Sequence, residues 1–214
     1  VRFSGSSTFG TNTLTSSRDK DIFVAKIDHN GNWLWAKQAG GISYDYGRGI
    51  AVDDNGNSYI TGEFEESATF GTTTLTSSGS YDIFVAKLDS SGNWLWAKQA
   101  WGIGEDVGFS IAVDAKGNSY ITGVFMESAN FGTTTLTSSG DYDIFVAKLD
   151  INSNWLWAKQ AGGTDDDYGN GIAVDANGNS YVTGYFSESA TFGTTTLTSS
   201  GDIDIFVVKL DSSG

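Results

Sequence analysis

The sequence predicts an all-β protein built from repeated four-stranded antiparallel sheets. The main support is a repeat of 61 residues, which runs through all 214 residues without insertion or deletion. Two sets of identical residues show this spacing: Asp21, Asp82, Asp143 and Asp204, and Phe9, Phe70, Phe131 and Phe192. Aromatic residues and Gly are abundant and Pro is absent, which suits strands joined by turns of Gly, Asn and Asp. Residues 1–214 therefore form one array of about three and a half repeats.

Each repeat contains two hairpin signals, which divide it into four strands. The first reads Asp-x-x-Gly-Asn-Trp, as in residues 89–94, and the second reads Asp-x-x-Gly-Asn-Ser, as in residues 114–119. The Asp accepts hydrogen bonds from the turn backbone, and the Gly takes the positive φ that follows a type I turn. Ser153 replaces this Gly in one copy, and we expect mild strain there because a Cβ disfavours positive φ.

In one repeat the four strands are expected at residues 108–113, 119–125, 143–149 and 154–160. The third strand is almost uniformly apolar, as in a strand that is covered on both faces. The Thr/Ser/Gly segment between the second and third strands, for example residues 68–79, is expected to form a long packed connection. No stretch combines helical periodicity with caps, so we expect almost no helix.

A four-stranded sheet with two apolar faces cannot bury both of them by itself. Stacking such sheets face to face as the blades of a β-propeller covers these faces. Four lysines lie inside the apolar third strand, and we expect each to pair with a carboxylate of the same or the next blade. They are Lys26, Lys87, Lys148 and Lys209.

Uncovered aromatic side chains on the terminal blades predict that the chain self-associates. A dimer that closes a seven-bladed ring fits the chain length. The two ends of the chain, however, occupy the same part of the 61-residue repeat, so a second chain would not continue the repeat where the first one stops. Three arrangements remain: a fragment of a longer array, a ring that closes by pairing leftover strands between chains, and an open assembly.

The repeat also carries a family resemblance. Its third and fourth strands read Asp-Ile-Phe-Val-Ala-Lys-Leu-Asp-x-x-Gly-Asn-x-x-Trp-Ala, and Gly-Gly-x-x-x-Asp-Tyr-Gly-x-Gly-Ile-Ala-Val-Asp-x-x-Gly-Asn-Ser-Tyr-Val-Thr-Gly follows. This pattern resembles the bacterial SBBP-type beta-propeller repeat over essentially the whole chain. The doubled Trp, as at Trp33 and Trp35, and the near-identity of the repeats depart from it. The resemblance implies a propeller from a large secreted or cell-surface protein, and it implies no activity.

Composition makes several function classes improbable. The net charge of −14 disfavours binding to nucleic acid or to an anionic membrane, because both would be repelled. The absence of Cys excludes disulfides and thiolate metal sites. The only His, His29, falls in a hairpin turn, and no base recurs beside a Ser. We therefore expect neither an enzyme nor a cofactor.

The acidic loop between the fourth strand and the next repeat is the best candidate polar site. Asp45, Asp106 and Asp167 recur there at one phase of the repeat and are weak candidates for ligand binding. Asp165, Asp166 and Asp167 form a run of three carboxylates, which would suit Ca²⁺ in chemistry but not in spacing. A hydrogen-bonded turn is the alternative that we favour.

Trp101 is a further weak candidate, because it stands where the other repeats have Gly40 and Gly162. Its ring could stack on a sugar, although a packing role is the simpler interpretation. The sequence as a whole favours a non-catalytic scaffold that presents loops for protein or glycan contact. The alternatives are a multivalent lectin with one equivalent site per blade, and a purely structural, self-assembling or designed repeat protein.

Overall fold

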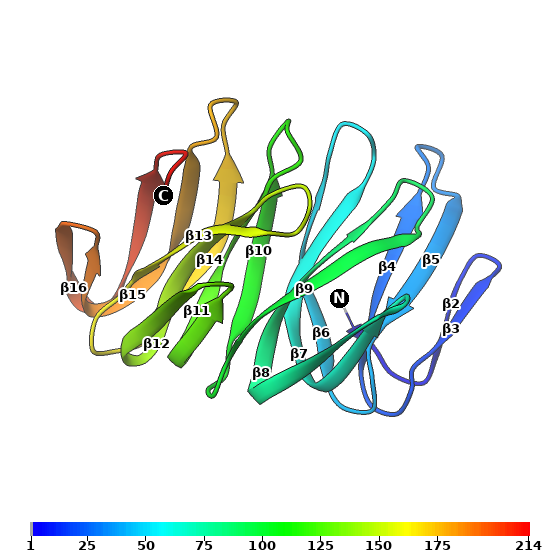
Figure 1. Cartoon of the computed structure of the whole chain (residues 1–214), viewed down its shortest axis with the longest axis horizontal. Helices are drawn as coiled ribbons and strands as arrows, with labels where there is room; N and C mark the ends of the chain where they lie inside the picture. The colour runs from blue at the N-terminus through cyan, green and yellow to red at the C-terminus, as the bar shows by residue number, and fades with distance from the viewer. Residues whose placement is uncertain (1) are drawn as a thin grey trace.

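The computed structural model describes residues 2–214, and within that range it contains strands and turns but no helix. The strands form antiparallel sheets that stand in a row, with the first and last sheets at opposite sides of Figure 1. The prediction of an all-β propeller array is confirmed. No helix that is long and apolar enough to cross a membrane occurs in residues 2–214.

Two complete four-stranded blades occupy the centre of the row. The second blade consists of β6 (Asp45–Val52), β7 (Ser58–Phe70), β8 (Thr73–Leu88) and β9 (Trp94–Gly102). The third blade consists of β10 (Val107–Val113), β11 (Ser119–Phe131), β12 (Thr134–Leu149) and β13 (Trp155–Ala161). A short pairing of β9 with β11 joins the two blades near Trp101.

A three-stranded sheet flanks these blades on each side. The first blade contains β1 (Arg2–Phe3), β4 (Asp21–Ile27) and β5 (Trp33–Ala39), with the hairpin of β2 (Ser6–Phe9) and β3 (Asn12–Thr15) beside it. The fourth contains β14 (Asp167–Val174), β15 (Ser180–Phe192) and β16 (Thr195–Leu210). The first strands of neighbouring blades, β6, β10 and β14, contact one another. They form the inner edge of the array, and the Trp strands form its outer edge.

The Thr/Ser/Gly segment is a continuation of two strands, which are therefore longer than expected. β7 and β8 pair along their length except at an irregularity that leaves Glu66 of β7 and residues 77–80 of β8 unpaired between the two strands. They end in a two-residue turn that begins at Gly71. Gly71 has a φ of 65°, as a type II′ hairpin turn requires. The long hairpin contacts the outer strand, where Gln99 Nε2 donates to the carbonyl of Thr76 at 2.9 Å. This contact protects an edge that would otherwise be free to pair.

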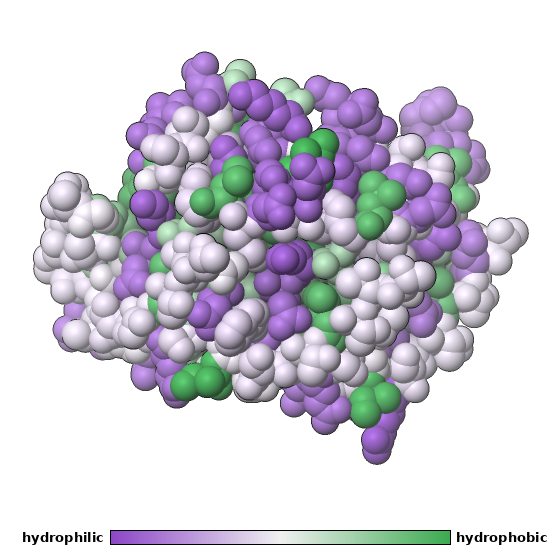
Figure 2. Space-filling view, in the orientation of Figure 1, coloured by the Kyte–Doolittle hydropathy of each residue, from purple (hydrophilic) through white to green (hydrophobic). Residues whose placement is uncertain are grey.

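The apolar core lies between the blades. In β8, Phe84 and Leu88 pack toward Ile22 of the first blade, whereas Ile83 and Val85 pack toward the third blade. The second and third sheets therefore bury both of their faces, as the alternation of side chains along a strand requires. On the face shown in Figure 2, hydrophobic side chains form only small separate patches among polar ones.

Three of the four lysines of the third strand lie on tyrosine rings: Lys87, Lys148 and Lys209. Lys87 is 5% exposed, and its Nζ lies 4.7 Å from the centre of the Tyr59 ring on the adjacent strand. Lys148 has the same relation to Tyr120, at 4.6 Å. The one ion pair found in residues 2–214 involves none of these lysines. The prediction of carboxylate partners was therefore wrong, because a ring on the neighbouring strand stabilises the cation instead.

At two of the three junctions, the turn after the third strand connects a blade to the preceding one. Lys26 Nζ and Trp35 Nε1 both donate to the carbonyl oxygen of Ser90 in the next blade, each at 3.2 Å. Lys148 and Trp157 donate to Ser212 in the same way. These bonds hold the outer halves of neighbouring blades together.

The junction between the second and third blades lacks this pair of bonds in the part of the chain that the structure describes. Its turn contains Ser153, whose φ of 65° confirms the expected left-handed conformation. In the neighbouring turn, a Cβ placed on the equivalent Gly92 would lie 2.8 Å from the ring of Trp35. The Cβ of Ser153 therefore crowds the space in which the indole of Trp96 would approach the turn.

We predict that Ser153→Gly stabilises the protein by about 1 kcal/mol, because it removes left-handed strain. For a chain of this length, about 1 kcal/mol raises the melting temperature by roughly 2–4 °C. The reverse substitution, Gly92→Ser, serves as the matched variant and should lower it. Thermal unfolding measures both, and a Ser153→Gly protein that melts no higher than the parent would contradict the assignment of strain.

Candidate functional site

The loop between each outer strand and the next inner strand brings aspartates together in buried pairs. Asp45 begins β6 and Asp21 begins β4, and both carboxylates approach Gly40. A Cβ on Gly40 would lie 2.8 Å from Asp45 Oδ2 and 3.0 Å from Asp21 Oδ1. The same arrangement recurs at the next two junctions, and every carboxylate in it is at most 1% exposed. We call these the acid pairs: Asp21 with Asp45, Asp82 with Asp106, and Asp143 with Asp167.

The hydrogen bonds of an acid pair organise the loop but leave oxygens unpartnered. Asp45 Oδ2 accepts from the backbone N–H of Gly41 at 2.7 Å, and Asp21 Oδ2 accepts from that of Ser17 at 3.1 Å. Asp21 Oδ1 and Asp45 Oδ1 have no hydrogen-bond partner in the described residues. Burial is the main cause that raises the pKa of Asp45 to about 8, and the charge of Asp21 contributes. One proton is therefore retained by the pair at neutral pH.

The structure places the three recurring candidates, Asp45, Asp106 and Asp167, below the surface as members of the acid pairs. No sequence pattern pointed to their partners, which lie 24 residues earlier in the chain and belong to another strand. That Asp45, Asp106 and Asp167 contact a ligand stays a prediction.

The run of three carboxylates, Asp165 to Asp167, does not converge on one point. Asp165 Oδ2 accepts from the Thr164 hydroxyl and Asp166 Oδ1 accepts from the backbone N–H of Tyr142, whereas Asp167 is buried. No group of three His, Cys, Asp or Glu side chains suited to a metal ion occurs in the described range.

Trp101 lies at the outer edge of the second blade, and its side chain is 42% exposed. Its carbonyl accepts from Asn130 Nδ2 at 3.2 Å, where β9 pairs with β11. At the equivalent position Gly40 has a φ of 147°, whereas the backbone of Trp101 is part of the regular strand β9. A role in stacking on a sugar stays a prediction. His29 is exposed in the turn between β4 and β5.

The repeats differ most in charge and size at one end of the blades, next to the acid pairs. Five equivalent positions carry these differences, and we call them the variable end. The first repeat has Arg2, Lys20, Tyr44, Tyr46 and Arg48; the second has Glu63, Tyr81, Glu105, Val107 and Phe109; the third has Val124, Tyr142, Asp166, Tyr168 and Asn170. The fold gathers these positions, because Tyr46 lies opposite Glu63 in the sheet and the backbone of Asp106 bonds to that of Tyr81.

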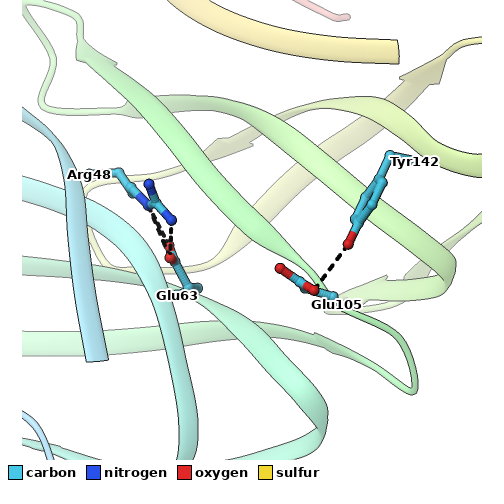
Figure 3. A network of polar contacts seen from close by, with 4 residues as sticks. All are labelled: Arg48, Glu63, Glu105 and Tyr142. Carbon is cyan, nitrogen blue, oxygen red and sulfur yellow. Dashed lines mark hydrogen bonds and ion pairs between the residues drawn. The ribbon is translucent and has the colours of Figure 1, made fainter. Parts of the chain in front are cut away.

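Two polar contacts hold side chains of the variable end on either side of the junction of the second and third blades (Figure 3). Arg48 Nε donates to both carboxylate oxygens of Glu63, at 2.9 and 3.0 Å, and the Tyr142 hydroxyl donates to Glu105 Oε2 at 3.0 Å. Burial raises the pKa of Glu63, and its bond to Arg48 opposes that rise. Burial and the hydrogen bond to Glu105 raise the pKa of Tyr142. The two pairs thus fix a charged and an aromatic group on adjoining blades.

Partly exposed rings continue this surface over three blades. The Arg48 guanidinium lies 5.5 Å from the centre of the Tyr46 ring and 5.8 Å from that of Phe109. Phe109 stacks on Tyr168 at 6.2 Å, and Tyr168 stacks on Tyr185 at 4.8 Å. Such groups stack, carry charge, and donate or accept hydrogen bonds, which are the properties of a recognition surface.

The acid pairs predict an unusual dependence of stability on pH. The raised pKa of Asp45 means that the folded protein keeps a proton that the unfolded chain releases. The stabilisation of the folded state by this bound proton is present at acid pH and is lost as the pH rises through about 8. Asp45→Asn, which cannot ionise and whose amide can donate to Asp21, should raise stability above pH 8 and flatten the pH dependence.

Asp28→Asn is the matched control. Hydrogen bonds from Asn32 lower the pKa of the exposed Asp28, so its contribution is present at neutral pH and is lost on acidification. Removal of this carboxylate should therefore reduce stability at pH 7. Urea unfolding from pH 5 to 9 tests both variants, and an Asp45→Asn protein that is less stable than the parent at pH 9 would contradict the shared proton.

Comparison with known proteins agrees with this architecture. The family model described as a beta-propeller repeat, SBBP, matches residues 34–63 and 156–185. Both segments run from the Trp strand of one blade into the second strand of the next blade, and they lie two repeats apart. They include the acidic loop and most of the variable end.

Two curated proteins are similar to most of the chain. An uncharacterized WD repeat-containing protein of Acanthamoeba polyphaga mimivirus is 28% identical over 184 residues, which is 72% of this chain and 13% of that protein. The regulatory protein FlaEY of Caulobacter vibrioides is 24% identical over 174 residues, which is 78% of this chain and 18% of that protein. The chain thus spans less than a fifth of the length of either relative. The family model thus identifies SBBP beta-propeller repeats at two positions of the chain.

Proposed function

We propose that this chain is a non-catalytic propeller scaffold that binds a protein or glycan partner through the variable end. The observation that carries the proposal is the distribution of differences among the repeats. Strands, turns and acid pairs are nearly constant, whereas charge and size change at the positions that the fold gathers at one end. A constant framework with a variable, partly exposed surface is the arrangement expected of a recognition module.

The same distribution distinguishes the proposal from a multivalent lectin. A lectin with one equivalent site per blade needs the same exposed residues in every repeat. Partly exposed polar residues that do recur include turn carboxylates such as Asp28 and Asp89, and their oxygens already accept hydrogen bonds from Asn32 and Asn93. The differences at the variable end favour one composite site that spans several blades. For the whole protein we propose a secreted or cell-surface location, in keeping with the family resemblance.

The test exchanges residues between repeats, so that each change already exists in the chain. Arg48→Asn with Glu63→Val introduces the residues that later repeats have at these positions, Asn170 and Val124. Asp54→Ala with Asn55→Lys makes the matched change at the opposite end, with the residues of the second repeat. Ligands are first selected against the parent chain from a displayed random-peptide library and a glycan array.

We expect the selected ligands to bind the first double variant at least tenfold more weakly and the second within twofold of the parent. Calorimetric titration measures both affinities, and thermal melting confirms that both variants fold. Ligands that lose affinity only with the second variant would place recognition at the turns. Failure to select any ligand would favour the purely structural alternative.

We also propose that the chain self-associates, because one sheet face is both apolar and exposed. Ile205 and Val207 of β16 are 82% and 72% exposed, whereas the equivalent Ile83 and Val85 are fully buried against the next blade. Acidic Asp202 and Asp204 flank this face. The first blade carries Arg2, Arg18 and Lys20, so its charge complements that of the fourth blade. Pairing of unlike faces between copies follows from this charge difference.

We predict that the mass in solution increases with protein concentration and that Ile205→Lys reduces this increase. A charge on the exposed face should oppose the burial that drives association. Ile103→Lys, at a loop residue that is 67% exposed, is the control and should leave the mass unchanged. Sedimentation equilibrium gives the masses, and a parent chain that stays monomeric at high concentration would refute the proposal.

A further inference from the structure

The third and fourth blades carry a group of partly exposed rings and carboxylates, which we call the tyrosine surface. It consists of Glu105, Tyr142, Asp166, Tyr168 and Tyr185. The rings of Tyr142 and Tyr185 lie 5.8 and 4.8 Å from that of Tyr168, centre to centre. Glu105 and Asp166 bond to the hydroxyl and the backbone N–H of Tyr142. Two carboxylates are therefore attached to the border of an aromatic platform.

The first junction of the chain shows what such a platform binds. Tyr46 is the equivalent of Tyr168, and three cations of the chain lie over its ring. The guanidinium of Arg2 is 4.6 Å from the ring centre, that of Arg48 is 5.5 Å away, and the ammonium of Lys20 is 5.7 Å away. The chain thus stabilises positive groups on this ring position by cation–π contact.

At the tyrosine surface the same positions have lost their cations. Val124, Tyr142 and Asn170 stand where the first junction has Arg2, Lys20 and Arg48. In the described part of the chain no Lys or Arg lies over Tyr142, Tyr168 or Tyr185. Asp166 replaces Tyr44 and adds a negative charge. The surface therefore has the rings and the charge for a cation but supplies none itself.

Charge in the wider molecule favours the same kind of partner. The net charge is −14, which attracts basic ligands and speeds their encounter. The charges of Glu105 and Asp166 act on Tyr142 and help to raise its pKa, after burial and the hydrogen bond to Glu105. A negative potential thus acts on the rings themselves. A neutral sugar would gain from the rings but not from this potential.

We propose that the tyrosine surface binds arginine or lysine side chains of a basic peptide segment in a partner protein. The cation lies over Tyr168, and Glu105 and Asp166 supply the opposite charge. The inference rests on the proposed function as a recognition scaffold and adds the chemical class of the partner.

The test uses a labelled peptide of alternating Gly and Arg, and a second peptide in which neutral citrulline replaces each Arg. The full chain should bind the Arg peptide at least tenfold more tightly than the citrulline peptide, and added salt should weaken binding. Tyr168→Leu should reduce affinity about five- to tenfold, in line with a cation–π contact of about 1 kcal/mol. Tyr168→Phe, which keeps the ring, should stay within twofold of the parent.

A charge control separates local from general attraction. Glu105→Gln and Asp54→Asn each remove one negative charge, but Asp54 lies in the turn between β6 and β7, at the other end of the blade. We expect a several-fold loss of affinity for Glu105→Gln and less than a twofold loss for Asp54→Asn. Equal losses for these two variants, or equal affinity for the two peptides, would overturn the proposal.

The outcome also separates this inference from the proposed function. If selected ligands depend on Arg48 and Glu63 but the Arg peptide binds no better than the citrulline peptide, recognition at the variable end stands and the basic partner is wrong. The same conclusion follows if a glycan binds the tyrosine surface but the Arg peptide does not: the surface recognises a partner, and the partner is not basic.

Discussion

The structure depends on one constraint: each sheet has two apolar faces and no other element of the chain to cover them. Phe84 and Ile83 are adjacent in β8, yet they pack into different layers of the core because side chains alternate along a strand. Every blade must therefore match the blade before it and the blade after it. A near-identical repeat satisfies this requirement, since the face that fits one neighbour fits them all. The same constraint accounts for the constancy of the strands and of the turns that donate or accept bonds across the junctions.

The constraint weakens at the ends of the blades, where side chains meet solvent as well as neighbouring sheets. At the variable end, Arg48 pairs with Glu63 in the second blade, whereas the equivalent residues of the fourth blade are Asn170 and Tyr185 on facing strands. The acid pairs lie directly beneath, and their buried carboxylates hold each loop in place. Neighbouring residues of one loop thus contribute to both the buried acid pairs and the variable end. This juxtaposition explains how a single framework can present different chemistry from blade to blade.

Much of this fold could be predicted from the sequence, because its evidence is periodic. The repeat, the two turn signals and the apolar third strand predicted the blade order and the positive φ at Ser153. The long hairpin was underestimated because its Thr-rich strands lack an apolar alternation and a bulge at Glu66 shifts their register. The prediction of carboxylate partners for the lysines was wrong because strand pairing determines the neighbour of Lys87. The register of β7 and β8 places Tyr59 beside it. The acid pairs and the variable end could not be predicted for the same reason. Their members are distant in sequence, and only the sheet brings them together.

Hydrogen exchange measured by mass spectrometry, with and without a ligand selected against the parent chain, is the most direct test of whether the variable end binds a partner. Amides in solvent-exposed loops exchange quickly unless a partner covers or rigidifies them. We expect a bound ligand to slow exchange in residues 42–48, 103–109 and 164–170, which contain the acidic loops and part of the variable end. Protection confined to the turns at residues 53–58 and 114–119, at the opposite end of the blades, would contradict it.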